Sequence, residues 1–298
     1  MDFKDIIGNE KEKNNLQTII ETNKIGHSYM FIGTDGIGKK LIAKEFARKI
    51  LCLSENKGCS SCQSCIEFQG DNHPDYIEIT PDGKNIKIDQ IRELQERVYE
   101  KPIISQKKVY IIDDSDLMTK EAQNCLLKTL EEPPQYIVII LIATDEDKLL
   151  NTIKSRCTKM VFSKLKVEEL KKYLGDAIVQ EDILKRANGS IKKLIHIQEN
   201  IETYIEINNT IENITNKSLL DVLRGADVFS KNKEIINEIL EYISLIFYEK
   251  VYNYDNKQVK YINCIKIIEE VKRRIVANSN FDMSIDYFLL KIWEELNE

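Results

Sequence analysis

The stretch GTDGIGKK, residues 33–40, contains most of the pattern of a phosphate-binding loop. The usual pattern is G-x-x-x-x-G-K followed by Ser or Thr. The positions that match it or lie within it are Gly33, Gly36, Gly38 and Lys39. Position 40 is Lys, so the hydroxyl that normally helps to hold Mg²⁺ is missing.

The residues around this loop provide the context that a phosphate loop needs. An apolar run, YMFIG (29–33), predicts a strand before it, and KLIAKEFARKILCL (40–53) has the apolar spacing of a helix after it. Backbone N–H groups at such a helix start attract anions, and Lys39 would reach the phosphates. The alternative is a plain glycine turn with lysines on a solvated helix start.

Strand and helix patterns alternate through the first half of the chain. Three further strands are predicted at DYIEIT (75–80), KVYIIDD (108–114) and YIVIILIAT (136–144), with helices at 88–102 and 119–134. Strands that are apolar on both sides are typical of a parallel sheet covered by helices on both faces. The sequence therefore predicts an α/β domain.

Strand patterns stop after about residue 163, and helical spacing continues to the end of the chain. We expect three parts: an α/β domain over 1–163, a small helical domain over 164–207 and a helical C-terminal domain over 208–298.

Composition indicates a globular protein. The chain has 298 residues, 42% hydrophobic and 31% charged, with a net charge of −6 and a pI near 5.4. The acidic balance argues against a free-standing nucleic-acid binder but leaves open a local basic patch or DNA contact within an assembly. No stretch approaches the ~18 apolar residues of a membrane span, and the first residues lack an apolar signal core. We expect a cytoplasmic protein with no membrane partner.

Two acids follow the apolar run of KVYIIDD. Asp113 and Asp114 resemble the second acidic motif of P-loop ATPases, in which the first Asp supports Mg²⁺. In the AAA+ class the next residue is usually Glu, the base that prepares water, and Asp114 is one methylene shorter. Acids that simply end a buried strand in a turn are the alternative.

Two longer stretches, NCLLKTLEEPP (124–134) and ATDEDKLLNTIKSRC (143–157), resemble the bacterial replicative clamp loader, an AAA+ family. IIGNE (6–10), GHSYMFIG (26–33) and HPDY (73–76) resemble it too. The resemblance covers about the first 200 residues, whereas the last third matches mainly in helical content and in ANSN (277–280). It implies a P-loop domain with a zinc-binding insert, a helical lid domain and an all-α collar domain that joins neighbouring subunits.

The resemblance assigns roles to three further residues. Arg156 matches the arginine of the S-R-C motif, which faces ATP on the neighbouring subunit, although a lone surface Arg is the alternative. Thr144 matches the first sensor. Lys192, in GSIK (189–192), stands where the family normally has a sensor Arg.

Departures from the family pattern indicate the subunit type. The motor subunits, gamma and tau, have a complete loop ending in Thr and an Asp-Glu pair, whereas the delta-prime type tolerates a degenerate loop. Lys40 and Asp114 therefore favour the delta-prime type, and the chain length agrees with it. We expect no independent ATPase activity and no hydrolytic use of Mg²⁺, while ATP binding stays open. A working gamma/tau-type ATPase is the alternative.

The resemblance also implies partners. These are the motor (gamma/tau) and delta subunits, the sliding clamp, and primer–template DNA contacted through the assembled complex.

Four of the seven cysteines lie close together: Cys52, Cys59, Cys62 and Cys65. Four thiolates fill a tetrahedral zinc shell without an open position, so a structural Zn²⁺ is predicted over catalytic metal chemistry. An iron–sulfur cluster is the rival, but the usual ferredoxin spacing and proline are absent. A zinc-dependent nucleic-acid module is a further alternative, and the scarcity of Lys and Arg in 55–71 counts against it.

Overall fold

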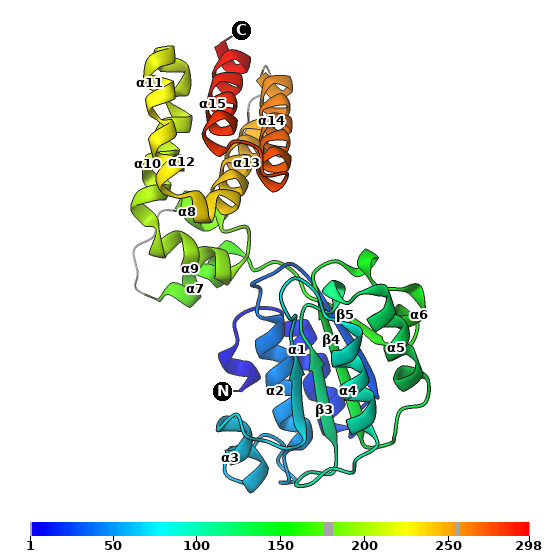
Figure 1. Ribbon diagram of the computed structural model, residues 1–298. Helices are drawn as coiled ribbons and strands as arrows, with labels where there is room; N and C mark the ends of the chain where they lie inside the picture. The colour runs from blue at the N-terminus through cyan, green and yellow to red at the C-terminus, as the bar shows by residue number, and fades with distance from the viewer. Residues whose placement is uncertain (1, 176–180, 254–256, 298) are drawn as a thin grey trace. The chain divides into compact units, whose positions relative to one another are not determined.

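The computed structural model describes residues 2–175, 181–253 and 257–297. The chain forms two compact units: Met1–Leu184 with Asn188–Lys193, and Lys185–Ala187 with Leu194–Glu298 (Figure 1). We call them the sheet unit and the helical unit. The finer division into three domains stays a prediction.

The sheet unit contains five parallel strands in the order β2-β3-β4-β1-β5. Their bounds are β1 Ser28–Ile32, β2 Tyr76–Ile79, β3 Lys108–Ile112, β4 Ile137–Ala143 and β5 Thr158–Val161. The four strands predicted from the sequence are confirmed. The fifth, β5, was not predicted, because three of the four residues of this edge strand are exposed and its apolar signal is weak.

Helices cover both faces of this sheet, as predicted (Figure 1). One apolar core joins the sheet to α1 (Glu10–Glu21) and α2 (Lys39–Leu51). The other joins it to α4 (Ile88–Val98), α5 (Lys120–Glu131) and α6 (Asn151–Lys154). Every residue of β1, β3 and β4 is buried, which explains their continuous apolar runs.

Local sequence fixes where several of these helices begin and end. Thr119 caps α5 by accepting a hydrogen bond from the Ala122 N–H at 3.2 Å, and two prolines follow the helix. Helix α4 ends at Val98, earlier than the predicted range of 88–102.

The remaining elements of the sheet unit are η1 Phe3–Asp5, α3 Gln63–Gln69, η2 Ser115–Leu117, η3 Glu146–Lys148 and α7 Val167–Leu174.

In the helical unit, all elements of the described residues are helices. Helix α8 (Glu181–Arg186) and α9 (Ile191–Glu199) each have residues in both units. The others are α10 Ile201–Glu212, η4 Ile214–Asn216, α11 Leu219–Arg224, α12 Ala226–Lys231, η5 Lys233–Ile235, α13 Ile236–Asn253, α14 Gln258–Val276 and α15 Phe281–Asn297. Phe229, Phe247 and Phe288 are fully buried in this unit. No helix of the described residues is long and apolar enough to cross a membrane.

Candidate functional site

The phosphate-loop pattern lies where β1 ends and α2 begins, at the carboxyl edge of the parallel sheet. Gly36 and Gly38 have φ angles of 75° and 92°, a region that L side chains avoid. The buried Lys39 Nζ donates to the carbonyl oxygens of Gly33 at 2.6 Å and Thr34 at 2.8 Å. Burial lowers the pKa of Lys39, although nearby acids including Asp35 act in the opposite direction. The predicted strand, loop and helix are thus formed, and the Lys39 ammonium points into the loop.

A second segment of the sheet unit, residues 188–193, closes against this loop. The Ile191 N–H donates to the Gly36 carbonyl at 2.8 Å, and Lys192 Nζ pairs with Asp35 Oδ2 at 2.7 Å. A Cβ atom at Gly36 would lie 2.2 Å from Ser190 Oγ, so this close approach requires glycine. The structure therefore brings the predicted sensor position, Lys192, to the phosphate loop.

Lys40 lies between two acids. Its Nζ is 2.9 Å from Asp113 Oδ2 and also contacts Glu78 of β2, while Lys44 Nζ lies 3.0 Å from the other Glu78 oxygen. Sequence reasoning included Lys40 and Asp113 but missed Glu78. The only signal for Glu78 was a polar residue in the alternating pattern of DYIEIT.

The other predicted acids follow β3 at the same edge. Asp114 has a φ of 49°, and burial together with the charges of Asp113 and Asp116 raises its pKa. The Thr144 N–H, just after β4, donates to Asp116 Oδ1 at 3.1 Å. The carboxyl edge thus holds the loop, both predicted acids and Thr144, and Asp116 is a second residue that the sequence did not reveal.

Arg156 lies at the opposite, amino-terminal edge of the parallel strands, in the segment between α6 and β5. Its carbonyl oxygen accepts a hydrogen bond from Ser28 Oγ at 2.7 Å, and Ser28 is the first residue of β1. A strand rises about 3.3 Å per residue, so β1 separates Arg156 from the loop at Gly33 by roughly 15 Å. The guanidinium pairs with Glu131 at 2.7 Å and is 34% exposed. The structure does not bring Arg156 to its own loop.

The four clustered cysteines converge on one point. Their sulfur atoms all lie within 4.8 Å of one another, with Cys52 Sγ 3.6 Å from Cys59 Sγ and 3.9 Å from Cys62 Sγ. Four sulfurs at about 2.3 Å from a tetrahedral zinc would be ~3.8 Å apart. The residues present therefore suit a single zinc ion, and a site of this width is too narrow for a multi-iron cluster.

Hydrogen bonds within the cluster favour thiolates at its exposed side. Backbone N–H groups of Ser61 and Cys62 donate to Cys59 and lower its pKa to about 5. Burial raises the pKa of Cys65 to about 12, while Arg48 donates to its sulfur at 3.8 Å. Arg48 also pairs with the buried Glu45 at 2.7 Å, which ties the cluster to α2.

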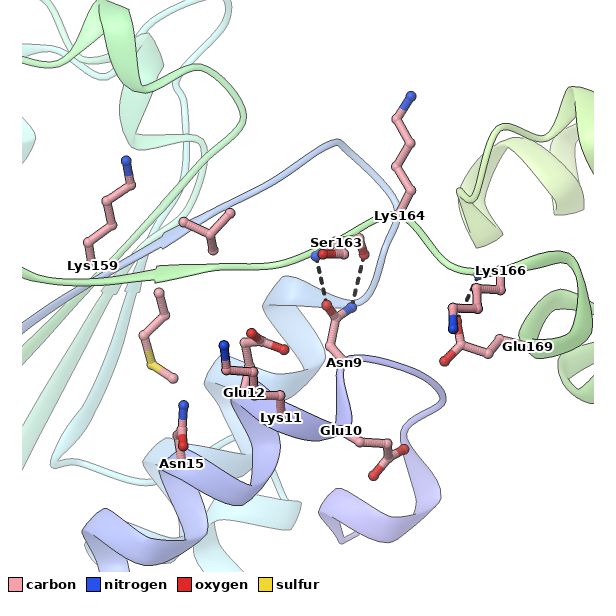
Figure 2. Close-up of a pocket in the computed structure, with 12 residues that line it drawn as sticks. Asn9, Glu10, Lys11, Glu12, Asn15, Lys159, Ser163, Lys164, Lys166 and Glu169 are labelled. Carbon is pink, nitrogen blue, oxygen red and sulfur yellow. Dashed lines mark hydrogen bonds between the residues drawn. The ribbon is translucent and has the colours of Figure 1, made fainter.

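A separate pocket of about 590 Å³ lies between α1, β5 and the start of α7 (Figure 2). Asn9, from the IIGNE stretch, accepts from the Ser163 N–H at 2.7 Å and donates to the Ser163 carbonyl at 3.2 Å. It thereby pairs with the backbone just beyond β5, the last strand in the order of the sheet. The lining mixes lysines with glutamates, as Figure 2 shows for Lys159, Lys164 and Glu169.

A parallel sheet with a glycine-rich loop between β1 and α2, a lysine at the helix start and acids after β3 defines the P-loop class of proteins. Within that class, the family model for "DNA polymerase III, delta subunit" matches residues 8–166. The chain belongs to this clamp-loader family.

Relatives of two subunit types are similar to the chain. DNA polymerase III subunit delta' of Bacillus subtilis is 34% identical over 211 residues, 68% of this chain and 62% of the relative. Subunit tau/gamma of Haemophilus influenzae is 34% identical over 209 residues, 66% of this chain and 30% of the relative. Subunit gamma/tau of Mycoplasma genitalium is 28% identical over 99% of this chain and 54% of the relative. The chain thus spans only part of the length of these relatives.

A solved structure shares the overall fold. The gamma subunit-related protein of Thermotoga maritima has a TM-score of 0.56 at 19% identity, over 94% of this chain and 99% of that one. This likeness concerns the fold alone.

Proposed function

We propose that this chain is a delta-prime-type subunit of the replicative clamp loader. It does not hydrolyse ATP, and it supplies Arg156 to ATP bound by a neighbouring motor subunit. Its partners are the motor (gamma/tau) and delta subunits, and through the complex the sliding clamp and primed DNA. A cytoplasmic location goes with this role.

The observation that carries the proposal is the position of Arg156 at the sheet edge opposite its own phosphate loop. The partly exposed guanidinium contacts surface groups of its own chain, namely Glu131, the Thr152 carbonyl at 2.8 Å and Ser155 Oγ at 3.4 Å. It is available to a nucleotide on another chain once the Glu131 pair opens. Its planar fork of donors suits the charge that develops on a γ-phosphate.

The altered loop supports the part of the proposal that the chain does not hydrolyse ATP. Lys40 provides an ammonium where a motor subunit has a hydroxyl for Mg²⁺, and Asp114 is a short base. Lys39 is bonded to carbonyls of the loop itself, and Lys192 pairs with Asp35 beside it. Nucleotide binding is left open by these contacts, but hydrolysis lacks its usual metal ligand.

Two other features belong to the proposed assembly. The helical unit exposes large apolar side chains, with Leu220, Tyr252, Val259, Val276 and Met283 each 70% exposed or more. Surfaces of this kind suit a collar that packs against other subunits. The four-cysteine cluster is a structural zinc module, because it leaves no open coordination position.

A working ATPase of the gamma/tau type is the second candidate. It is favoured by the complete glycine pattern up to Lys39 and by the equal identity, 34%, to a delta' and a tau/gamma relative. ATP turnover by the isolated chain separates the two candidates. A rate of about one per second, the low end of ordinary enzymes, that Lys39→Ala abolishes would establish the motor type.

The proposed role in trans is tested on the assembled loader. Arg156→Ala, mixed with motor and delta subunits, should still assemble but lower DNA-stimulated ATPase and clamp loading by an order of magnitude or more, since finger arginines contribute about 10³–10⁵ at one site. Arg156→Lys should restore only part of the rate, because Lys lacks the planar fork.

Lys154→Ala is the matched control, because it removes a positive charge two residues away on α6. It should assemble and turn over at the unmodified rate. An Arg156→Ala loader that assembles and hydrolyses ATP as fast as this control would show that Arg156 has no role in trans.

A further inference from the structure

We propose that Lys40 is a built-in cation that takes the place of a divalent metal and excludes Mg²⁺ from the acids beside the phosphate loop. The inference deepens the proposed function and rests on it for the nature of the loop. The proposed function needs only the loss of the hydroxyl at position 40. This inference goes further and assigns the Lys40 ammonium a role of its own in the folded chain.

The geometry places one ammonium between two carboxylates that come from different strands. Lys40 Nζ lies 2.9 Å from Asp113 Oδ2, after β3, and contacts Glu78 Oε1, in β2. The side chains of these acids are only 16% and 19% exposed, whereas that of Lys40 is 41% exposed. The two acids are therefore partly withdrawn from water and need a positive charge between them.

The charges of Lys40 and Glu78 depend on one another. Burial acts to lower the pKa of Lys40, but its hydrogen bonds to Glu78 and Asp113 outweigh this and raise it. Burial acts to raise the pKa of Glu78, but its hydrogen bonds to Lys40 and Lys44 outweigh this and lower it. At neutral pH the ammonium and the Glu78 carboxylate are both charged, and each holds the other in that state.

Two carboxylate oxygens close to a phosphate loop are the ligand type that Mg²⁺ prefers. The ammonium already contacts one oxygen of each acid, and its positive charge repels a divalent cation that approaches them. Removing it would uncover Asp113 Oδ2 and Glu78 Oε1 at once, while Lys44 would stay beside the other Glu78 oxygen. A threonine at position 40 would add the hydroxyl of the complete loop pattern, and the acids would then accept a metal.

Lys44 provides an internal comparison. It lies one turn further along α2 and pairs with Glu78 at 3.0 Å, without a contact to Asp113. Removing Lys44 takes one cation from the same carboxylate but leaves Lys40 between the two acids. Only Lys40 should therefore determine whether a divalent cation binds.

The experiment uses the full zinc-loaded chain, in buffer freed of divalent cations by resin so that no chelator strips the cysteine cluster. The probes are MgCl₂, followed by the thermal midpoint Tm, and Mn²⁺, followed by its electron paramagnetic resonance signal. The unmodified chain should show no Mn²⁺ site, and millimolar MgCl₂ should not change its Tm.

Lys40→Thr should lower Tm by about 2–4 °C without divalent cations, a scale set by one lost ion pair in a unit of this size. MgCl₂ should restore most of this loss, because a ligand that binds only the folded state stabilises it. The same variant should bind one Mn²⁺, and adding Asp113→Asn should abolish that binding. Lys44→Thr should lose stability without recovering it in MgCl₂.

Mn²⁺ binding by the unmodified chain would overturn the inference, as would a Lys40→Thr chain that keeps its circular dichroism spectrum and gains no divalent site. Either result leaves the role of Arg156 untouched. Conversely, a loader unaffected by Arg156→Ala would contradict the proposed function without affecting the conclusion drawn from the metal measurements on Lys40.

Discussion

Single side chains decide whether the phosphate loop and the segment that closes on it stay together. Gly36 combines a φ of 75° with a position where an added Cβ would lie 2.2 Å from Ser190 Oγ. Gly83 has nearly the same φ, 71°, with nothing within 4 Å of an added Cβ. The two glycines share the backbone requirement but differ in their surroundings.

We therefore expect Gly36→Ala to destabilise the chain more than Gly83→Ala. Placing a Cβ in the left-handed region costs roughly 1–2 kcal/mol at either position. Gly36→Ala adds a steric clash that must push residues 190–192 away and weaken the Lys192–Asp35 pair. Urea unfolding followed by circular dichroism measures both losses. Equal losses in the two variants would mean that the segment does not pack on the loop.

At the level of helices and strands, prediction from sequence succeeded where the signal is local. β1, β3 and β4 are buried on both sides, so their apolar runs could be recognised directly. The edge strand β5 has one buried residue in four and could not be predicted from its apolar pattern. Its place in the sheet depends on pairing with β1, more than a hundred residues away in the chain.

The same division holds for the site residues. The loop glycines, Lys39 and the four cysteines could be recognised because short spacings define them. Glu78 and Asp116 could not, since each acquires its role from a partner that only the fold brings near, Lys40 in one case and the Thr144 N–H in the other. The position of Arg156 opposite its own loop likewise follows from the parallel pairing of β5 with β1, because Arg156 precedes β5 and the loop follows β1.

From the position of the cysteine cluster we predict how the segment around the short helix α3 responds to the loss of zinc. Cys62 and Cys65 belong to its start, while Cys52 directly follows α2. Because metal binding supplies folding free energy to small modules of this kind, Cys59→Ser should lower bound zinc from one per chain toward zero and make residues 52–70 sensitive to protease.

Cys125→Ser is the matched control for this measurement. Its thiol donates to Gln95 Oε1 at 3.0 Å, on the other face of the sheet from the cluster, and its replacement should leave zinc unchanged. Zinc content by elemental analysis decides the result. Iron in the purified chain, or zinc retained by Cys59→Ser, would contradict a four-cysteine zinc site.

The chain as a whole consists of two compact units, and this division sets how we expect it to unfold. The single tryptophan, Trp293, belongs to the helical unit, where its indole N–H donates to the Lys217 carbonyl at 3.1 Å. Its fluorescence therefore reports on that unit, whereas circular dichroism reports on both. The cysteine cluster belongs to the sheet unit. Removing the metal therefore tests whether the circular dichroism signal changes while the Trp293 fluorescence does not.

We expect zinc removal to destabilise the sheet unit alone. Stripping the metal from the full chain should lower the urea midpoint seen by circular dichroism and leave the Trp293 fluorescence midpoint unchanged, since lost metal-binding free energy falls on the unit that holds the ligands. Adding zinc back should restore the first midpoint. If both midpoints fell together and recovered together, the two units would unfold as one cooperative body, and the zinc module would stabilise the surface proposed to join the collar as well as the sheet.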